Sequence, residues 1–171
     1  VNSVEEAKRA IDTCIYPPAG KRGFGPCRAI RYGIDDTLEY IEHGSYELCR
    51  FLQVETKDAV DAMDEVSKIP YMDGFIIGPM DLSGSVGELG HALEGDKTNR
   101  LVELAVEKAR KNGKPIGLST GSVDSAELTH WMSKGIDFIS AGTDMWSIIS
   151  GARSLLARMR EVSDTVGYDR Q

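Results

Sequence analysis

The chain has 171 residues, of which 41% are hydrophobic and 27% are charged, and this composition is typical of a single globular domain over residues 1–171. Its net charge is −7 and it has no basic cluster, which argues against nucleic acid and anionic membranes as partners. No apolar run approaches the ~20 residues of a transmembrane helix, and no signal-peptide pattern is present, so we expect a cytoplasmic protein with reduced cysteines.

The first element in the chain is a predicted helix over residues 4–15. Its apolar residues recur at helical spacing, and Ser3 is a suitable N-cap. The face expected to be buried consists of Val4, Ala7, Ala10 and Ile11.

An irregular segment follows over residues 16–26. Three prolines and three glycines in these eleven residues exclude a helix or a central strand. Its backbone amides could contact an anion, with Lys21 and Arg22 adding positive charge, or it could be a shaped turn with two solvated cations. Beyond it, residues 28–33 and 35–42 have the pattern of two short helices.

The chain is organised around two apolar runs, within residues 51–56 and 75–83, which end on Glu55 and Asp81 respectively. Unbroken apolar runs are typical of buried parallel strands. Residues 57–68 between them have helical spacing, so this part of the chain predicts a strand–helix–strand unit. The predicted N-cap and inner face of that helix are Thr56, Ala59, Ala62, Met63 and Val66.

The two terminal carboxylates of this unit should lie close together. Neighbouring strands are about 4.8 Å apart, so Glu55 and Asp81 can reach a single point. Two unpaired carboxylates at that distance repel each other, and a hard divalent cation is the usual way to hold them there. The alternative is that each acid forms an ordinary salt bridge or a helix N-cap.

Residues 84–96 are glycine-rich and contain Glu88, His91 and Glu94. The spacing of Glu88 and His91 could indicate metal ligation, but no regular element is predicted to hold them. We interpret this segment as a mobile loop.

The second half of the chain continues the alternation of helices and strands. A helix is predicted over 99–111 and ends at Gly113, followed by a strand over 114–119 and a helix over 123–134. A last strand over 136–141 leads to a helix that is capped by Thr143 or Asp144 and reaches about residue 162, and the polar tail 163–171 is expected to fray. The inward positions expected in the two middle helices are Leu101, Leu104, Ala105 and Lys108, and Leu128, Trp131 and Met132, with His130 at a surface or interface.

Repeated strand–helix units build either an open doubly wound sheet or a (β/α)8 barrel. No Gly-x-Gly-x-x-Gly motif follows a strand, so dinucleotide binding has no support. Both architectures place functional residues at the carboxyl ends of strands, where Glu55 and Asp81 are expected.

Three motifs point to a family. Tyr16-Pro17-Pro18-x-Gly20-x-Arg22-Gly23-x-Gly25, Gln53-Val54-Glu55-Thr56 and Asp73-Gly74-x-x-Ile77-Gly78-Pro79-x-Asp81-Leu82-Ser83 occur in this order. Together they resemble the HpcH/HpaI aldolase family, the class II metal-dependent pyruvate aldolases such as 4-hydroxy-2-oxoheptanedioate aldolase and 2-keto-3-deoxy sugar-acid aldolases. The likeness extends to Ala141-Gly142-Thr143-Asp144.

The resemblance implies an α/β fold, a (β/α)8 TIM barrel of the pyruvate/phosphoenolpyruvate-binding type, with only its later strands, about the fifth to the eighth, in this sequence. Val1 would fall at the end of the fourth strand. The family's catalytic histidine–aspartate pair and its pyruvate-binding arginine lie in earlier strands, and no residue here matches them. We therefore expect a longer chain or a second chain that supplies those strands, and a homo-oligomer, a hexamer by resemblance, in which the last helix packs on a neighbour.

The same resemblance implies a function. Glu55 and Asp81 would bind Mg²⁺ or Mn²⁺, with Co²⁺ as an alternative, and the metal would chelate pyruvate. Gln53 would contact the keto acid, and the backbone amides of Met80 and Asp81 would receive its carboxylate. The activity expected is that of a carbon–carbon lyase, which cleaves a 2-keto-(3-deoxy) acid to pyruvate and an aldehyde through a metal-stabilised enolate.

Alternatives remain open at this point. Arg22 or Arg28 could face the aldehyde, although a surface ion pair explains either residue equally well. A phosphate-binding TIM-barrel isomerase would use the helix start at residues 142–144. A catalytically inactive fragment or assembly module is the third possibility.

Overall fold

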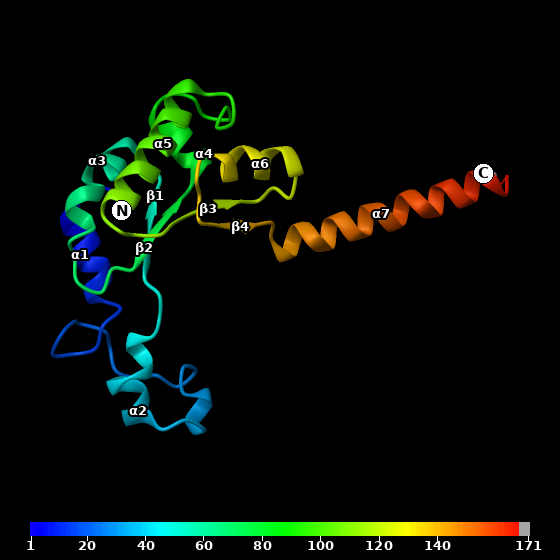
Figure 1. Ribbon diagram of the computed structural model, residues 1–171. Helices are drawn as coiled ribbons and strands as arrows, with labels where there is room; N and C mark the ends of the chain where they lie inside the picture. The colour runs from blue at the N-terminus through cyan, green and yellow to red at the C-terminus, as the bar shows by residue number, and fades with distance from the viewer. Residues whose placement is uncertain (168–171) are drawn as a thin grey trace.

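The computed structural model describes residues 1–167, and its centre is a parallel sheet of four strands in the order β1-β2-β3-β4 (Figure 1). Each strand pairs with the next strand in the chain. The strands are β1 (Phe51–Val54), β2 (Gly74–Ile77), β3 (Ile116–Thr120) and β4 (Phe138–Ala141). Within the described residues, no helix is both long and apolar enough to cross a membrane.

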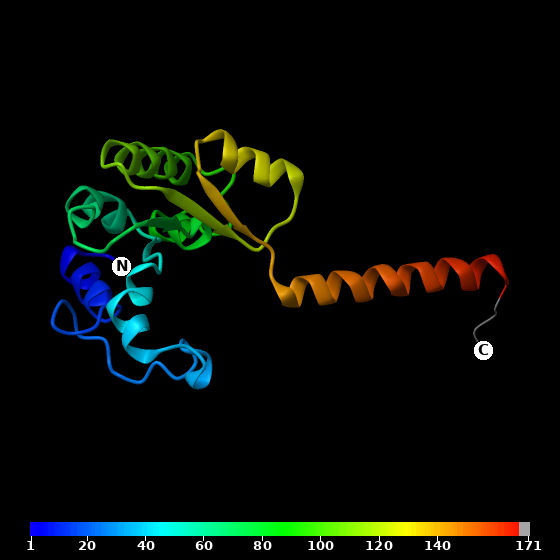
Figure 2. The same cartoon turned by 60° about the horizontal axis from the view of Figure 1, so that its bottom comes forward.

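Helices connect the strands and lie side by side along the sheet (Figure 2). A connection between neighbouring parallel strands is almost always right-handed, so successive helices fall on the same face of the sheet. This arrangement, with strands in chain order, is that of a segment of a barrel and differs from a doubly wound sheet. The helices are α1 (Val4–Asp12), α3 (Lys57–Val66), α4 (Pro79–Ser85), α5 (Asp96–Lys111) and α6 (Ser125–Ser133).

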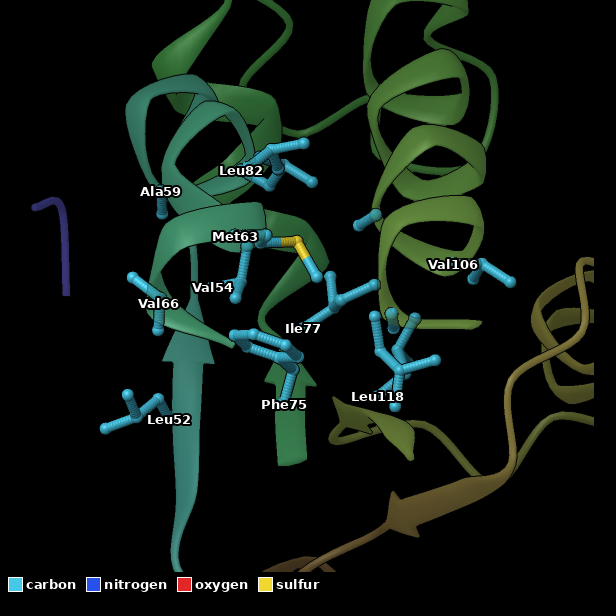
Figure 3. Packing of buried hydrophobic residues seen from close by; sticks show 14 of the residues in the cluster. Leu52, Val54, Ala59, Met63, Val66, Phe75, Ile77, Leu82, Val106 and Leu118 are labelled. Atoms are coloured by element: carbon cyan, nitrogen blue, oxygen red, sulfur yellow. The ribbon is translucent and has the colours of Figure 1, made fainter. Parts of the chain in front are cut away.

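The core lies between the sheet and these helices (Figure 3). Alternate strand residues point into it, so Leu52 and Val54 of β1 are buried, whereas Gln53 between them is exposed on the opposite face. Met63 of α3 meets the buried residues of β2 there. The helix-facing side of the sheet is therefore the packed side.

The buried face of α5 differs from the expected one. Thr98, Val102, Ala105 and Val106 are buried, but Leu101 and Leu104 are only partly buried. The inner stripe is thus rotated by one position from the prediction, with Ala105 common to both. In α6 Trp131 is buried as expected, but Met132 is 62% exposed, because adjacent helix residues point about 100° apart and the indole takes the inward direction.

The predicted N-caps and helix-terminating glycines are confirmed, but α1 ends at Asp12 and not at residue 15, α3 ends at Val66 and not at residue 68, and α5 begins at Asp96 and not at residue 99. Ser3 and Thr56 accept a hydrogen bond from a first-turn amide of α1 and α3, respectively, and Thr143 does so for the last helix, α7 (Asp144–Thr165). Gly113 and Gly135 follow α5 and α6 with φ angles of +63° and +88°, the left-handed conformation that glycine adopts without strain.

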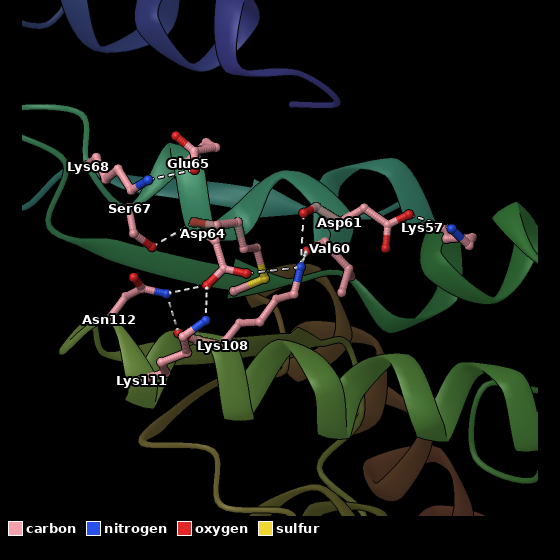
Figure 4. Close-up of polar contacts among 11 residues, drawn as sticks. Lys57, Val60, Asp61, Asp64, Glu65, Ser67, Lys68, Lys108, Lys111 and Asn112 are labelled. Carbon is pink, nitrogen blue, oxygen red and sulfur yellow. Dashed lines mark hydrogen bonds and ion pairs between the residues drawn. The ribbon is translucent and has the colours of Figure 1, made fainter.

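A polar cluster joins α3 to α5 (Figure 4). The Asp64 carboxylate accepts hydrogen bonds from Asn112 at 2.9 Å and Lys111 at 3.2 Å, and Lys108 lies 3.4 Å away. Lys108 also donates to the carbonyl of Val60 at 2.9 Å. These contacts fix the two helices relative to each other along their polar edge.

The segment between α1 and β1 forms an excursion away from the sheet (Figure 1). It contains α2 (Thr37–Glu42) and two short 3₁₀ helices, Arg31–Gly33 and Gly44–Tyr46, near the positions predicted for short helices. The guanidinium of Arg22 lies 4.5 Å from the ring centre of Tyr16 and donates to the Tyr40 hydroxyl at 3.3 Å. Arg22 therefore joins the irregular segment to α2, in place of the solvated cation that was one expectation.

Helix α7 (Asp144–Thr165) extends away from the rest of the molecule (Figures 1 and 2). It continues three residues past the predicted end, and residues 168–171 of the tail lie outside the described residues. None of its residues is buried. Five of its exposed apolar side chains are spaced by three, four or seven residues and so share one face of the helix: Met145, Ile148, Leu155, Met159 and Val162.

Candidate active site at the carboxyl ends of the strands

The two carboxylates singled out in the sequence follow adjacent strands. Glu55 comes directly after β1, and Asp81 lies in the first turn of α4, just beyond the end of β2. Val54 and Ile77 are directly paired in the sheet, so the two strands end at the same level. Both acids therefore lie at the carboxyl edge of the sheet, where barrel enzymes place their active sites.

The side chains of these residues interact. Partial burial and the negative charge of Asp81 raise the pKa of the Glu55 carboxyl. Gln53 Nε2 donates to Glu55 Oε1 at 2.6 Å and so orients that carboxylate. The position of the Glu55 carboxylate also depends on Gly78, because a Cβ at residue 78 would lie only 2.7 Å from Glu55 Oε1.

This pair of acids fits a hard divalent cation. Their mutual repulsion is unrelieved by a lysine or arginine partner in the described part of the chain, and carboxylate oxygens are the ligands that Mg²⁺ prefers. Residues 1–167 contain no cluster of three or more His, Cys, Asp or Glu side chains that would complete a protein-only site. Mg²⁺ usually keeps several waters and takes only one or two carboxylates, so two ligands are a sufficient protein contribution.

The first turn of α4 offers backbone donors next to Asp81. The N-cap residue is Gly78, which has no side chain to accept hydrogen bonds, and Pro79 occupies the start of the helix. The amides of Met80 and Asp81 therefore lack a side-chain cap. Met80 is 54% exposed, so this turn is open at the edge of the sheet.

Other residues considered in the sequence have structural contacts. Glu88 accepts hydrogen bonds from the Thr98 amide at 2.9 Å and hydroxyl at 2.8 Å, so it caps the start of α5. His130 Nε2 lies 2.9 Å from Asn99 Oδ1, at the interface between α5 and α6. The start of α7 uses the hydroxyl of Thr143, which accepts from the Trp146 amide at 3.2 Å.

The sequence did not single out Glu127, which lies at the same edge of the sheet. The Thr120 hydroxyl at the end of β3 donates to Glu127 Oε1 at 2.7 Å. Burial raises the pKa of the Glu127 carboxyl, but hydrogen bonding from Thr120, Ser122 and Trp131 outweighs it, so the pKa is lowered and the group is ionised at neutral pH. The only sequence signal is that Glu127 lies one helical turn before Trp131.

Comparison with known proteins adds to this geometry. The profile of the family described as HpcH/HpaI aldolase/citrate lyase matches residues 1–151. The chain is 32% identical over 160 residues to the hydroxypyruvate/pyruvate aldolase of Roseovarius nubinhibens. The matched region covers 94% of this chain and 61% of that protein. It is 33% identical over 161 residues to the 4-hydroxy-2-oxovalerate aldolase of Novosphingobium aromaticivorans, and this match covers 94% of this chain and 60% of that protein.

Solved structures resemble the fold over most of this chain. An HpcH/HpaI aldolase/citrate lyase family protein from Burkholderia cenocepacia J2315 has a TM-score of 0.79 at 22% identity, covering 94% of this chain and 62% of that one. The HpcH/HpaI aldolase from Desulfitobacterium hafniense DCB-2 has a TM-score of 0.77 at 23% identity, covering 94% and 61%. The chain thus spans about three fifths of the length of the proteins it matches.

Proposed function

Because the chain belongs to the HpcH/HpaI aldolase/citrate lyase family, we propose that it carries the metal site of a carbon–carbon lyase. The reaction is the aldol cleavage of a 2-keto-(3-deoxy) acid to pyruvate and an aldehyde, and the reverse condensation. The observation that carries this proposal is the pairing of β1 with β2, which brings Glu55 and Asp81 to one edge of the sheet.

In this proposal Glu55 and Asp81 hold Mg²⁺ or Mn²⁺. The raised pKa of Glu55 reflects burial and a neighbouring negative charge, which a bound cation would relieve. When bound, the cation would supply Lewis-acid chemistry, stabilising the negative charge that develops on the keto oxygen of pyruvate during deprotonation of its methyl group.

Two further parts of the chain bind and orient the keto acid. Gln53 holds the Glu55 carboxylate in place by donating a hydrogen bond from its amide nitrogen. The same side-chain amide also contacts the keto acid. The uncapped amides of Met80 and Asp81 receive the substrate carboxylate, because the first turn of a helix presents N–H donors that have no partner within the helix.

Metal binding can be tested separately from turnover. Glu55→Gln and Asp81→Asn preserve side-chain volume but remove the charge that a hard cation requires. We expect each variant to lose Mn²⁺ affinity by at least about 100-fold in calorimetry, with no loss of fold by circular dichroism. The matched control is Asp58→Asn, an exposed acid in the first turn of α3 that should leave Mn²⁺ affinity unchanged.

Unchanged Mn²⁺ affinity in both variants would show that these acids are structural. The reaction class has its own test, which is pyruvate release from a 2-keto-3-deoxy acid, with and without EDTA, by the protein together with the expected earlier strands; residues 1–171 alone should show no turnover. We expect chelation to abolish turnover and Mn²⁺ to restore it. Turnover that is indifferent to the chelator contradicts the metal mechanism, and a metal-independent isomerase activity favours the phosphate-binding alternative.

A further inference from the structure

The chain contains one asparagine–glycine pair, Asn112-Gly113, directly after α5. Asn112 is the C-cap of that helix, and Gly113 follows it in the left-handed conformation with a φ angle of +63°. A Cβ built on Gly113 would meet no atom within 4 Å apart from its chain neighbours, so the turn borders open space there. The backbone beside the asparagine therefore has neither a side chain of its own nor a packed neighbour on that side.

An asparagine side chain can react with the backbone of the residue that follows it. The backbone nitrogen attacks the side-chain carbonyl carbon, the bond from that carbon to the amide nitrogen breaks, and ammonia leaves with the proton that the backbone nitrogen has lost. Water then opens the resulting cyclic imide at one of its two carbonyl groups, which gives aspartate or isoaspartate. The reaction consumes a water, releases an ammonia and changes no oxidation state. Glycine in the second position favours it, because no Cβ hinders the attack.

Hydrogen bonds restrain both partners of this reaction in the folded protein (Figure 4). The amide nitrogen of Asn112 donates both of its hydrogens, to Asp64 Oδ1 at 2.9 Å and to the carbonyl of Lys108 at 2.8 Å. The backbone N–H of Gly113 donates to the carbonyl of Arg110 at 3.0 Å. The attack needs a free side chain and a backbone nitrogen without its proton, so it requires a local opening of the contact between α3 and α5.

The product carboxylate does not fit the place of the amide. A carboxylate only accepts hydrogen bonds, so it can donate neither to Asp64 nor to the carbonyl of Lys108. It would lie beside the Asp64 carboxylate and at the C-terminus of α5, where the helix dipole disfavours negative charge. Lys108 and Lys111 offset part of this repulsion, but both already contact Asp64, at 3.4 Å and 3.2 Å. The reaction therefore weakens the contact between α3 and α5.

We propose that Asn112 is a deamidation site controlled by the contact between α3 and α5. The reaction is slow while the contact is closed, and its rate follows the fraction of molecules in which the contact is open. Because the product weakens the same contact, a modified chain opens there more readily than an unmodified one. The inference concerns the chemical ageing of the chain and does not depend on the proposed lyase function.

Peptide mass spectrometry after incubation in mildly alkaline buffer measures the reaction in the full-length protein. The peptide that contains Asn112 should gain the mass difference between a hydroxyl and an amide NH₂ group, slowly in the folded protein and much faster in urea. Asp64→Ala removes one of the two acceptors and should raise the rate in the folded protein by about tenfold. The matched control Asp61→Ala removes an exposed acid that pairs with Lys57 and should leave the rate unchanged.

A second destabilised variant separates opening of this contact from global unfolding. Gly117→Ala strains the sheet against the Phe138 ring and leaves the bond between Asp64 and Asn112 intact. While folded, it should react as slowly as the unmodified protein. A rate in Asp64→Ala that is no higher than in Gly117→Ala overturns the inference, and so does a folded protein that reacts as fast as the chain in urea.

The effect of the product has a separate measurement. Asn112→Asp reproduces the product that has an ordinary backbone, and Asn112→Ala loses the same two hydrogen bonds without adding a charge. We expect Asn112→Asp to unfold at a lower urea concentration than both the unmodified protein and Asn112→Ala. An Asn112→Asp variant as stable as the unmodified protein overturns the claim that the modification weakens the contact.

Discussion

Two glycines in the inner strands allow two aromatic rings from the outer strands to meet. Phe51 of β1 is paired with Gly74, and Phe138 of β4 is paired with Gly117. The two rings lie edge to face, with centres 5.1 Å apart, on the side of the sheet opposite the helices. This contact spans all four strands, and it depends on the absence of a Cβ at both glycines.

Alanine at these glycines should destabilise the protein to different extents. A Cβ at Gly74 would lie 2.5 Å from the Phe51 ring and 2.6 Å from the carbonyl oxygen of Pro115, a backbone atom that cannot turn away. We expect Gly74→Ala to lower the free energy of unfolding by about 1–3 kcal/mol, measured by urea denaturation. At Gly117 the three atoms nearest to a Cβ all belong to the Phe138 ring, and a side chain can turn away, so Gly117→Ala should cost less.

A double variant distinguishes ring contact from backbone contact. Removing the ring with Phe138→Ala should make the further change Gly117→Ala nearly neutral, whereas Phe51→Ala should rescue Gly74→Ala only in part. Full rescue at position 74 would show that the Pro115 carbonyl can shift, contrary to this account.

The sequence predicts where a side chain lies when its place at the end of a strand decides that location. Glu55 and Asp81 could be placed at one edge because each follows an apolar run, and the register of parallel strands then aligns their ends. Their roles as metal ligands stay a prediction. Glu127 could not be found in this way, because its position depends on how α6 packs over β3, and a single acidic residue on a helix face carries no sign of that packing.

Among the secondary-structure elements, the contact between α3 and α5 depends on one carboxylate. Hydrogen bonds from Asn112 and Lys111, together with the nearby charge of Lys108, lower the pKa of Asp64 to about 2. An ordinary aspartate titrates near 3.9, so the folded state binds a proton less readily than the unfolded state. The stabilisation is therefore complete above about pH 4 and is lost as the pH falls through the folded value of about 2.

Asp64→Asn should thus lower stability at pH 7, with a difference from the unmodified protein that shrinks as the pH approaches 2. Chemical denaturation at a series of pH values measures this difference. Asp61→Asn is the matched control on the same helix, because Asp61 is exposed and pairs only with Lys57 one turn away; it should change stability little at any pH. A pH-independent effect of Asp64→Asn would contradict the assignment of the stabilisation to its charge.

Most elements were predictable from local signals, and the errors have physical causes. Caps such as Ser3 and Thr56 mark helix starts through a hydrogen bond within one turn, so sequence reveals them directly. The inner faces of α5 and α6 were less certain, because apolar residues occupy two adjacent faces of each helix, with Leu101 and Leu104 beside the buried face of α5 and Met132 beside that of α6. In α6 the bulk of Trp131 decided the orientation and left Met132 exposed.

At the scale of the whole molecule, α7 extends away from the rest of the fold (Figures 1 and 2). It has 22 residues and none is buried, while its apolar stripe is repeated at the spacing of a helix that packs on another surface. We propose that this stripe packs on a second copy of the chain in a homo-oligomer.

Charge in the stripe should break that assembly. We expect the double variant Ile148→Glu and Leu155→Glu to have a lower molar mass than the unmodified protein by light scattering, because burying unpaired carboxylates is unfavourable. Ser147→Glu with Ser154→Glu adds the same charge beside the stripe and should retain the larger mass. Equal masses for all three proteins would show that the stripe does not hold copies together.

The agreement between strand order in the sheet and strand order in the chain has a kinetic consequence. Each strand pairs with the next strand in the chain, a few tens of residues away, so each pairing closes a shorter loop than a pairing between strands at opposite ends of the chain. The growing chain can add one strand and one helix at a time as it leaves the ribosome, with β1 and β2 pairing before β3 is available. Glu55 and Asp81 follow β1 and β2, so this pair of carboxylates is in place before β3 and β4 are synthesised.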